Sequence, residues 1–259
     1  PAQSTYTQVT TLADGPELNE PYGVALMPSG ELIVADAGHR KILRVSMAGV
    51  VTVVAGNGEL GERDGAAAQA QFKRPVAVAY DPVRDLIYVA DTQSDSIRRI
   101  GGGTVSTFAA TGFSDPMGLT LDSAGNLYVA DSGNNRIKKI TVAGVVTTLA
   151  GSGPAGNLDH AQALQARFNQ PNGLVFAANG ALYIADQKNH LIRKLENGAV
   201  TTVAGNGTNG WVDGAALSAK FREPRGLAFD ATGSLLVADS NNNLVRRVTL
   251  GASPAVSTI

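Results

Sequence analysis

One pattern recurs along this chain, and its clearest copy reads Pro116-Met117-Gly118, then Gly125-Asn126-Leu127-Tyr128-Val129-Ala130-Asp131, then Asn134-Asn135-Arg136-Ile137. The same pattern begins at four other prolines, which are Pro21, Pro75, Pro171 and Pro224. Successive copies start between 41 and 55 residues apart, so a core of constant design carries connectors of variable length. A period of this size is typical of repeat architectures.

Each copy contains four short runs rich in Val, Ile, Leu, Thr and Tyr, which we expect to form four consecutive strands. Turns with glycine, such as Ser29-Gly30 and Asn179-Gly180, separate the first two runs, because tight hairpins need a positive φ. Both faces of such sheets are apolar, and radial stacking of four-stranded blades covers both. The sequence therefore predicts an all-β fold, a β-propeller with five visible blades, as a single domain over residues 1–259.

The N-terminal segment raises the question of closure. Residues 8–13 resemble the fourth strand of a copy, as a comparison of Val9–Ala13 with Val146–Ala150 shows. They add one strand to the number that five closed blades need. We therefore expect either a closed five-bladed ring or part of a six-bladed parent in which residues 8–13 form the closing strand. A ring that is not closed should self-associate through its ends.

The quoted motifs resemble the NHL repeat. The resemblance covers nearly the whole chain in five copies. The copy that opens at Pro75 diverges most, with Ala77 in place of glycine and Ser94-Asp95-Ser96 in place of the Asn-x-Arg triplet. The resemblance implies a propeller, usually of six blades, in proteins that range from scaffolds and RNA or protein binders to a few enzymes.

Composition excludes several classes of protein. The 21 Lys and Arg balance 22 Asp and Glu, so no overall charge favours nucleic acid as a partner. No apolar run approaches the 18 or more residues that a membrane-spanning helix needs. The chain has no Cys, which excludes disulfides and thiolate metal sites. It begins at Pro1 without a leader, and we favour a secreted or periplasmic bacterial protein.

Two kinds of charged residue recur, and both have a structural interpretation. An aspartate ends the second strand of every copy, where we expect it to accept N–H groups of the following turn: Asp36, Asp91, Asp131, Asp186 and Asp239. Nine basic residues lie on the third strands, where we expect their stems to cover apolar edges while their charged ends stay in water: Arg44, Arg98, Arg99, Lys138, Lys139, Arg193, Lys194, Arg246 and Arg247.

Three connectors between copies are long and alike, over residues 61–72, 156–168 and 210–221. Each predicts a turn, an aspartate N-cap, a short helical turn and a docked Phe. The other connectors are short, so these inserts should decorate one face and leave a groove beside them. Trp211, the only tryptophan, lies in the third insert and is a candidate ligand platform.

The residue between the Pro and the Gly of each copy should lie at the mouth of the channel: Tyr22, Val76, Met117, Asn172 and Arg225. The resemblance to NHL-like lyases would place zinc-binding histidines there, and none of these residues is His. We interpret His39 and His190 as turn residues. No catalytic signature occurs, and we expect no cofactor, metal ligand or catalytic residue.

The sequence thus favours a non-enzymatic binding or scaffold propeller whose decorated face binds a protein, a peptide or a small ligand. The proposed contacts are Tyr22, Met117, Asn172, Arg225 and Trp211. Two alternatives stay open. One is a metal-dependent hydrolase or lyase whose ion is held at the channel mouth by Asn172 with some of Glu20, Asp115 and Glu223. The other is a purely architectural or engineered repeat module.

Overall fold

The computed structural model describes residues 10–13 and 17–259. The chain divides into two compact units. The N-terminal unit holds residues 11–129 and 139–147, and the C-terminal unit holds residues 130–138 and 148–259. No helix among the described residues is long and apolar enough to cross a membrane.

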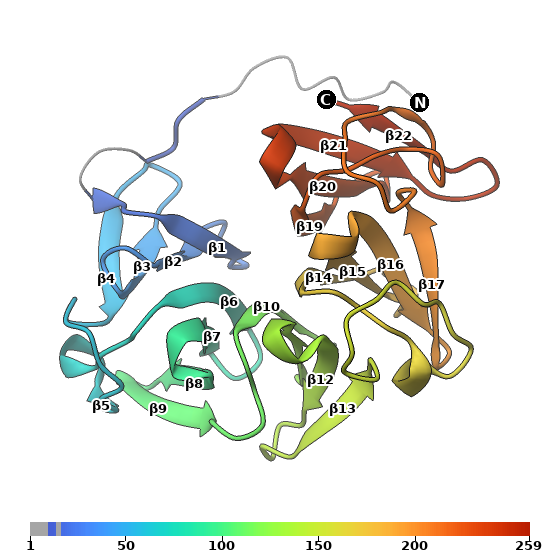
Figure 1. The fold of residues 1–259 in the computed structure, drawn as a ribbon. Helices are drawn as coiled ribbons and strands as arrows, with labels where there is room; N and C mark the ends of the chain where they lie inside the picture. Colours follow the sequence, from blue (N-terminus) through green and yellow to red (C-terminus); the bar gives the residue numbers. More distant parts are fainter. Residues whose placement is uncertain (1–9, 14–16) are drawn as a thin grey trace. The chain divides into compact units, whose positions relative to one another are not determined.

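Five antiparallel sheets follow one another along the chain, each with its four main strands in sequence order (Figure 1). Blade 1 consists of β1 (Pro21–Leu26), β2 (Leu32–Asp36), β3 (Lys41–Val45) and β4 (Val51–Ala55). Blade 2 consists of β6 (Pro75–Asp81), β7 (Leu86–Asp91), β8 (Ser96–Gly101) and β9 (Thr104–Ala109). Blade 3 consists of β10 (Pro116–Leu121), β11 (Leu127–Asp131), β12 (Arg136–Ile140) and β13 (Val146–Ala150). Blade 4 consists of β14 (Pro171–Phe176), β15 (Leu182–Asp186), β16 (Leu191–Glu196) and β17 (Ala199–Ala204). Blade 5 consists of β19 (Pro224–Phe229), β20 (Leu235–Asp239), β21 (Leu244–Thr249) and β22 (Ala255–Thr258). The prediction of five four-stranded blades is confirmed.

Two of the long inserts add a short fifth strand to the blade that follows them. The strand β5 (Gly65–Ala66) pairs antiparallel with β9, and β18 (Gly214–Ala215) pairs with β22. The first two inserts also contain single 3-10 turns, η2 (Ala67–Gln69) and η5 (Ala163–Gln165). Similar turns follow the second strands of blades 2 to 5: η3 (Thr92–Ser94), η4 (Ser132–Asn134), η6 (Gln187–Asn189) and η7 (Ser240–Asn242).

The predicted aspartate N-caps of the inserts are wrong. Ala66 precedes η2 and Gln162 precedes η5, and neither makes a side-chain cap hydrogen bond. In the third insert the segment that corresponds to η2, residues 216–218, forms a turn and no 3-10 helix. The insert aspartates Asp64, Asp159 and Asp213 instead form ion pairs with buried arginines. Each pair neutralises the full charge of a buried guanidinium, whereas an N-cap would satisfy only one backbone N–H group.

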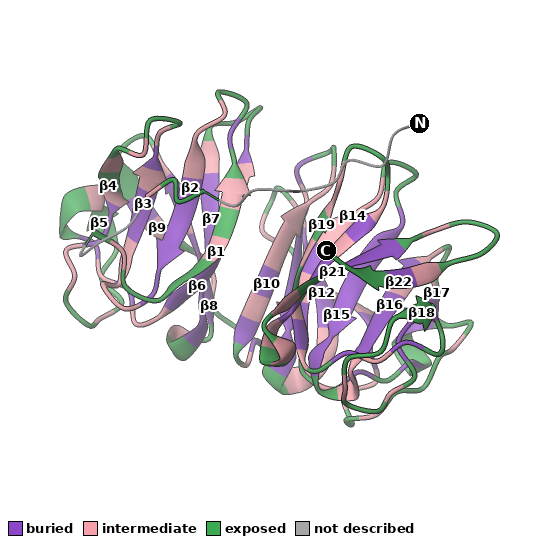
Figure 2. Ribbon diagram, turned by 90° about the horizontal axis from the view of Figure 1, so that it is seen from above, coloured by how far each residue is buried: buried purple, intermediate pink, exposed green. Residues whose placement is uncertain are grey.

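The second strands of blades 3 and 4 are buried on both faces. Every residue of β11 and of β15 is buried, and Figure 2 shows β15 and the neighbouring β16 mainly in the colour of buried residues. Alternate residues of one strand belong to different cores: Val89 packs with Ile33 of blade 1, while Ala90 packs with Val129 of blade 3. This double burial explains why the runs are continuously apolar rather than alternating.

Close approach of neighbouring blades explains the glycine in the Pro-x-Gly motif. A Cβ atom at Gly23 would lie 2.6 Å from the carbonyl oxygen of Val76 in blade 2. A Cβ atom at Gly173 would collide with the carbonyl oxygen of Arg225 in blade 5. Only glycine lets the first strands approach so closely at these two positions.

The predicted closing strand is only partly described. Residues 8 and 9 lie outside the described residues, and residues 10–13 belong to no strand. Instead, Leu12 lies over blade 1, where its carbonyl oxygen would collide with a Cβ atom at Gly49. The closing role of residues 8–13, the closure of the ring and the single domain over residues 1–259 stay predictions.

Candidate functional site

A buried aspartate anchors each blade, although not through the N–H groups we expected. In blade 4, Asp186 Oδ1 accepts the backbone N–H of Asn169 at 2.8 Å, from the connector 17 residues earlier. Its Oδ2 accepts the side-chain amide of Asn189, in the following turn, at 2.8 Å. For Asp186 the predicted bonds to backbone N–H groups of the turn are therefore wrong, because the carboxylate joins the turn to the segment that enters the blade.

The first basic residue of each third-strand pair is buried, which corrects the expectation that these residues stay solvated. In blade 4 the guanidinium of Arg193, fully buried, donates to Asp186 Oδ2 at 2.7 Å and to the carbonyl of Arg167 at 3.0 Å. It also donates to Asp159 of the insert at 2.6 Å, and it lies 5.3 Å from the ring centroid of Phe168. A guanidinium suits this position because its planar donors reach several acceptors at once.

The same arrangement recurs in blades 2 and 5. Arg98 contacts Asp91, Asp64 and the ring of Phe72. Arg246 contacts Asp239, Asp213 and the ring of Phe221. These buried arginines pin the inserts to their blades. We call each set an arginine clamp.

Burial controls the charge state of the clamp in blade 4. Burial raises the pKa of Asp186 to about 6, against the opposing effect of the Arg193 charge and of the hydrogen bonds from Asn169 and Asn189. The carboxylate therefore depends on its partners for ionisation, since a buried charge is stable only when paired and hydrogen-bonded.

Blades 1 and 3 depart from this arrangement. In blade 3, Lys138 replaces the arginine and its ammonium lies 3.0 Å from Asp131. In blade 1 the corresponding residue is Leu43, and Asp36 is paired with His39, whose Nδ1 lies 2.7 Å from Oδ2. A pocket of about 250 Å³ opens beside this carboxylate, lined by Glu17, Asp36, His39, Lys41, Leu43, Val51 and Val53.

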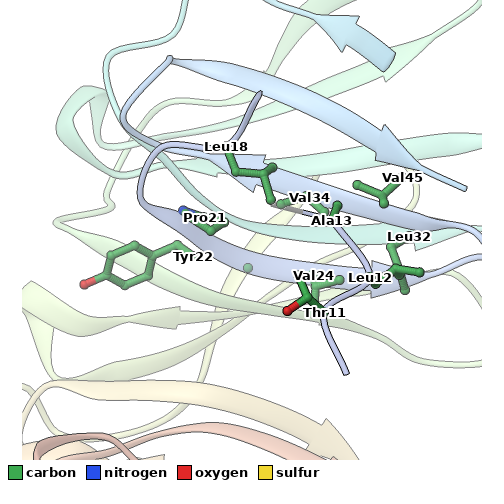
Figure 3. Close-up of a pocket in the computed structure, with 11 residues that line it drawn as sticks. Thr11, Leu12, Ala13, Leu18, Pro21, Tyr22, Val24, Leu32, Val34 and Val45 are labelled. Atoms are coloured by element: carbon green, nitrogen blue, oxygen red, sulfur yellow. The ribbon is translucent and has the colours of Figure 1, made fainter. Parts of the chain in front are cut away.

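A second pocket, of about 370 Å³, lies on the face of blade 1 that turns away from blade 2, and its lining is mostly apolar. Figure 3 shows Leu18, Ala13, Val34 and Val45 gathered there, while the ring of Tyr22 extends away from them. Both pockets belong to blade 1, and our sequence reasoning found neither. The signal available for the first was Leu43, which interrupts the row of basic residues at this position.

Two of the proposed contact residues, Asn172 and Arg225, join one polar network in the C-terminal unit. Asn172 is buried and donates to Gln187 Oε1 at 3.1 Å, and Gln187 donates to Glu223 Oε2 at 3.1 Å. Lys188 Nζ donates to Glu223 Oε1 at 2.7 Å, and an Arg225 guanidinium nitrogen lies 3.9 Å from Glu223 Oε2. The hydrogen bond from Lys188 is the main reason that the pKa of Glu223 is lowered.

His190 supports this network from its turn, as we expected of a turn residue. Its Nδ1 accepts the backbone N–H of Glu223 at 3.2 Å. Burial lowers the pKa of His190, which favours the neutral ring that can accept this bond.

The other predicted contacts have separate environments. Tyr22 lies beneath the guanidinium of Arg74, 5.4 Å from its ring centroid. Met117 is half-buried, with its sulfur 3.9 Å from the Thr92 hydroxyl. Trp211 is 72% exposed, so its ring faces solvent. The structure therefore joins Asn172 with Arg225, while Tyr22 and Met117 belong to the other unit.

Three of the residues named for a metal-dependent alternative, Glu20, Glu223 and Asn172, have other partners. Glu20 lies 3.6 Å from Arg74, and Glu223 is held by Lys188 and Gln187. Across residues 10–13 and 17–259, no group of three or more His, Asp or Glu side chains could hold a metal ion. The described residues thus offer no specific support for this alternative.

Comparison with known proteins accounts for the repeat. The NHL repeat family matches residues 113–140, 168–195 and 221–247, which span the entry segment and first three strands of blades 3, 4 and 5. The chain is an NHL-repeat protein. It is 31% identical to the protein SUPPRESSOR OF QUENCHING 1, chloroplastic, of Arabidopsis thaliana, over 90% of this chain and 25% of that protein. It is 30% identical to NHL repeat-containing protein 2 of Homo sapiens, over 84% of this chain and 36% of that protein. The chain thus spans less than two fifths of the length of either relative.

Solved structures agree on the fold of this NHL-repeat protein. An auxiliary nutrient binding protein from Bacteroides ovatus has a TM-score of 0.75 at 18% identity, over 95% of this chain and 61% of that one. A chain of a nidogen/laminin complex has a TM-score of 0.70 at 21% identity, over 93% and 80%. Virginiamycin B lyase from Staphylococcus aureus has a TM-score of 0.63 at 15% identity, over 92% and 69%. At sequence identities this low, the likeness to these structures shows the propeller fold and says nothing about the activity of this chain.

Proposed function

We propose that this NHL-repeat protein is a binding module whose inserts and neighbouring polar network take a segment of a partner protein or a peptide. The observation that carries the proposal is the exposure of large apolar side chains on inserts that arginine clamps hold in place. Trp211, Val212 and Leu217 of the third insert are exposed, as are Leu158 and Leu164 of the second.

Rigid presentation is what distinguishes these side chains from ordinary exposed residues. Arg246 donates to the carbonyl of Val212 and to the carboxylate of Asp213, the two residues that follow Trp211. Arg193 holds Leu158 and Asp159 of the second insert in the same way. A preorganised apolar residue loses little conformational entropy on binding, and tryptophan is enriched among residues that dominate binding energy.

The polar network supplies the complementary charge. The side chain of Arg225 is 32% exposed beside Glu223, so it can receive a carboxylate of the ligand while its own pair is retained. Asn172 is buried, and in this proposal it holds Gln187 and the network rather than contacting the ligand. The nutrient-binding and nidogen/laminin neighbours show that propellers of this fold class serve binding, which supports the proposal in general terms.

The test uses peptides selected from a random library on the immobilised chain. Because Trp211 is the only tryptophan, its fluorescence reports binding directly: the emission should shift to the blue when the ring leaves water. Trp211→Ala has no tryptophan, so its binding is followed by isothermal titration calorimetry, and its Kd should rise at least about thirtyfold, which corresponds to a hot-spot cost of ~2 kcal/mol. Arg225→Ala should weaken acidic peptides most.

The matched control is Val83→Ser, which removes another exposed apolar side chain, on the hairpin between β6 and β7. It should leave the Kd unchanged, and all variants should keep the melting temperature of the parent chain. Selected peptides that bind the Trp211→Ala, Arg225→Ala double variant with unchanged Kd contradict the proposed site.

A further inference from the structure

We infer that the pocket beside Asp36 in blade 1 is an open guanidinium site, which takes an arginine side chain from a partner polypeptide. The argument rests on a comparison among the blades of this chain and is independent of the binding face proposed above.

The carboxylate of Asp36 has two of the three partners that its counterparts have. Oδ1 accepts the backbone N–H of Asn19 at 2.8 Å, as Asp186 does from Asn169 and Asp239 from Arg222. Oδ2 is paired with the side chain of His39 at 2.7 Å, where the other two are paired with an asparagine of the turn. Asp36 therefore has, like Asp186 and Asp239, one partner in the segment that enters the blade and one in the turn that follows the strand.

The missing third partner is the cation. Asp186 and Asp239 each receive a guanidinium nitrogen on Oδ2, at 2.7 and 2.9 Å. In blade 1 the residue at that register position is Leu43, which pairs with Val34 as Arg193 pairs with Ile184. Among the ion pairs of the described residues, His39 is the one partner of Asp36.

The chain itself offers no arginine for this position. The residues outside the described ones, 1–9 and 14–16, contain neither Lys nor Arg. Lys41 lines the pocket, but its ammonium lies beside Gly58, 4.0 Å from where a Cβ atom at that glycine would be. The pocket thus has a buried carboxylate without the guanidinium found in blades 2, 4 and 5.

The walls of the pocket match the surroundings of the clamped arginines. Glu17 stands four residues before the first strand, as do Gln71, Arg167 and Lys220, whose carbonyls accept the guanidinium in the other blades. Glu17 is exposed and lines the pocket, so its carboxylate is available as a second anion in place of the insert aspartate. Leu43, Val51 and Val53 supply apolar walls for a long aliphatic stem.

Size and donor geometry favour arginine over smaller cations. A volume of about 250 Å³ holds several waters or one long side chain, since a water occupies about 30 Å³. A guanidinium offers five N–H donors in a plane and can bridge Asp36 and Glu17, whereas an ammonium acts as a compact point charge.

The experiment titrates the intact chain with arginine blocked at both ends, and follows the imidazole signals of its 3 histidines by NMR. His39 is assigned through His39→Asn. We expect a saturable shift confined to His39, with a Kd on the order of 1 mM for so small a probe. Blocked citrulline, which has the shape of arginine without its charge, is the matched control and should produce no shift.

Two variants locate the site. Leu43→Arg supplies the internal guanidinium of the other blades and should abolish binding while the amide spectrum stays folded. Glu17→Gln changes only an exposed side chain, so it keeps the proposal testable if Leu43→Arg does not fold, and it should weaken binding severalfold. A His39 shift that is absent, that citrulline or blocked lysine reproduces at equal Kd, or that is unchanged in a folded Leu43→Arg variant overturns the inference.

Discussion

Residues of one type at equivalent or adjacent positions have different environments in this chain. Arg98 is buried in a clamp, while the next residue, Arg99, lies against the ring of Phe108, 5.4 Å from its centroid. Strand alternation sends the two side chains to opposite faces, so adjacent basic residues cannot share one role. The glycines of the first strands also differ in environment, because only some of them meet the backbone of a neighbouring blade.

Gly173 and Gly226 occupy the same position in blades 4 and 5 and should respond differently to alanine. A Cβ atom at Gly173 would collide with the Arg225 carbonyl, whereas at Gly226 the nearest atom is the Ala238 Cβ at 3.4 Å. Gly173→Ala should lower the free energy of unfolding by roughly 1–3 kcal/mol, the usual cost of overpacking. Gly226→Ala should stay within about 0.5 kcal/mol of the parent. Urea unfolding of both variants measures these free energies. If both variants lose the same stability, the close approach of blades is not the reason that glycine is required at position 173.

At the scale of the element, the inserts are held by charge rather than by helix capping. The carboxylate of Asp213 joins strand β22 to Arg246: Oδ2 accepts the backbone N–H of Thr258 at 3.0 Å, and Oδ1 accepts the guanidinium at 2.6 Å. Burial by itself would raise the pKa of Asp213, but the hydrogen bonds from Thr258 and Arg246 lower it. The insert thus depends on an ionised aspartate.

Acid should therefore loosen the third insert. Because the pKa of Asp213 is lower in the folded chain than its ordinary 3.8, its contribution is fully present above that value and is lost as the pH falls through the folded-state pKa. Trp211 fluorescence should change across this acid range and be constant at higher pH. Asp213→Asn should show the altered signal already at neutral pH.

The matched control is Asp64→Asn, the same change in the first insert. It should leave the fluorescence profile of Trp211 as in the parent chain. If Asp213→Asn gives the parent profile too, the carboxylate is not what holds the third insert.

At the scale of the whole molecule, each blade is built to pack on both faces, and among the described residues of the N-terminal unit one face of blade 1 has no blade against it. Val24 and Leu26 are 59% and 69% exposed. Their counterparts Leu227 and Phe229 in blade 5 pack against the core of the C-terminal unit. The face that includes the pocket of Figure 3 is thus made of blade-packing residues.

If the ring is not closed, we expect a second copy of the chain to cover this face, because the surfaces that pack on such a face elsewhere in the chain are other blades. The chain should self-associate with rising concentration, and Val24→Ser with Leu26→Ser should shift it toward monomer. Light scattering coupled to size-exclusion chromatography measures the mass, and Val83→Ser is the control that should leave it unchanged. A parent chain that stays monomeric at every concentration contradicts the expectation.

The sequence by itself determined the blades. Period, hairpin glycines and apolar runs depend on local geometry and on burial from both sides, and these leave a direct pattern in residue order, as in Leu127–Asp131. The tertiary structure decided the partners of the charged residues. Arg193 meets Asp159 from 34 positions away, and Asn172 joins Glu223 through Gln187, because electrostatic partners are selected by proximity in space. The tertiary structure also decided that Asp36 has no guanidinium partner among the described residues and a pocket beside it. Leu43 breaks the sequence pattern, but only the packing of blade 1 shows the pocket.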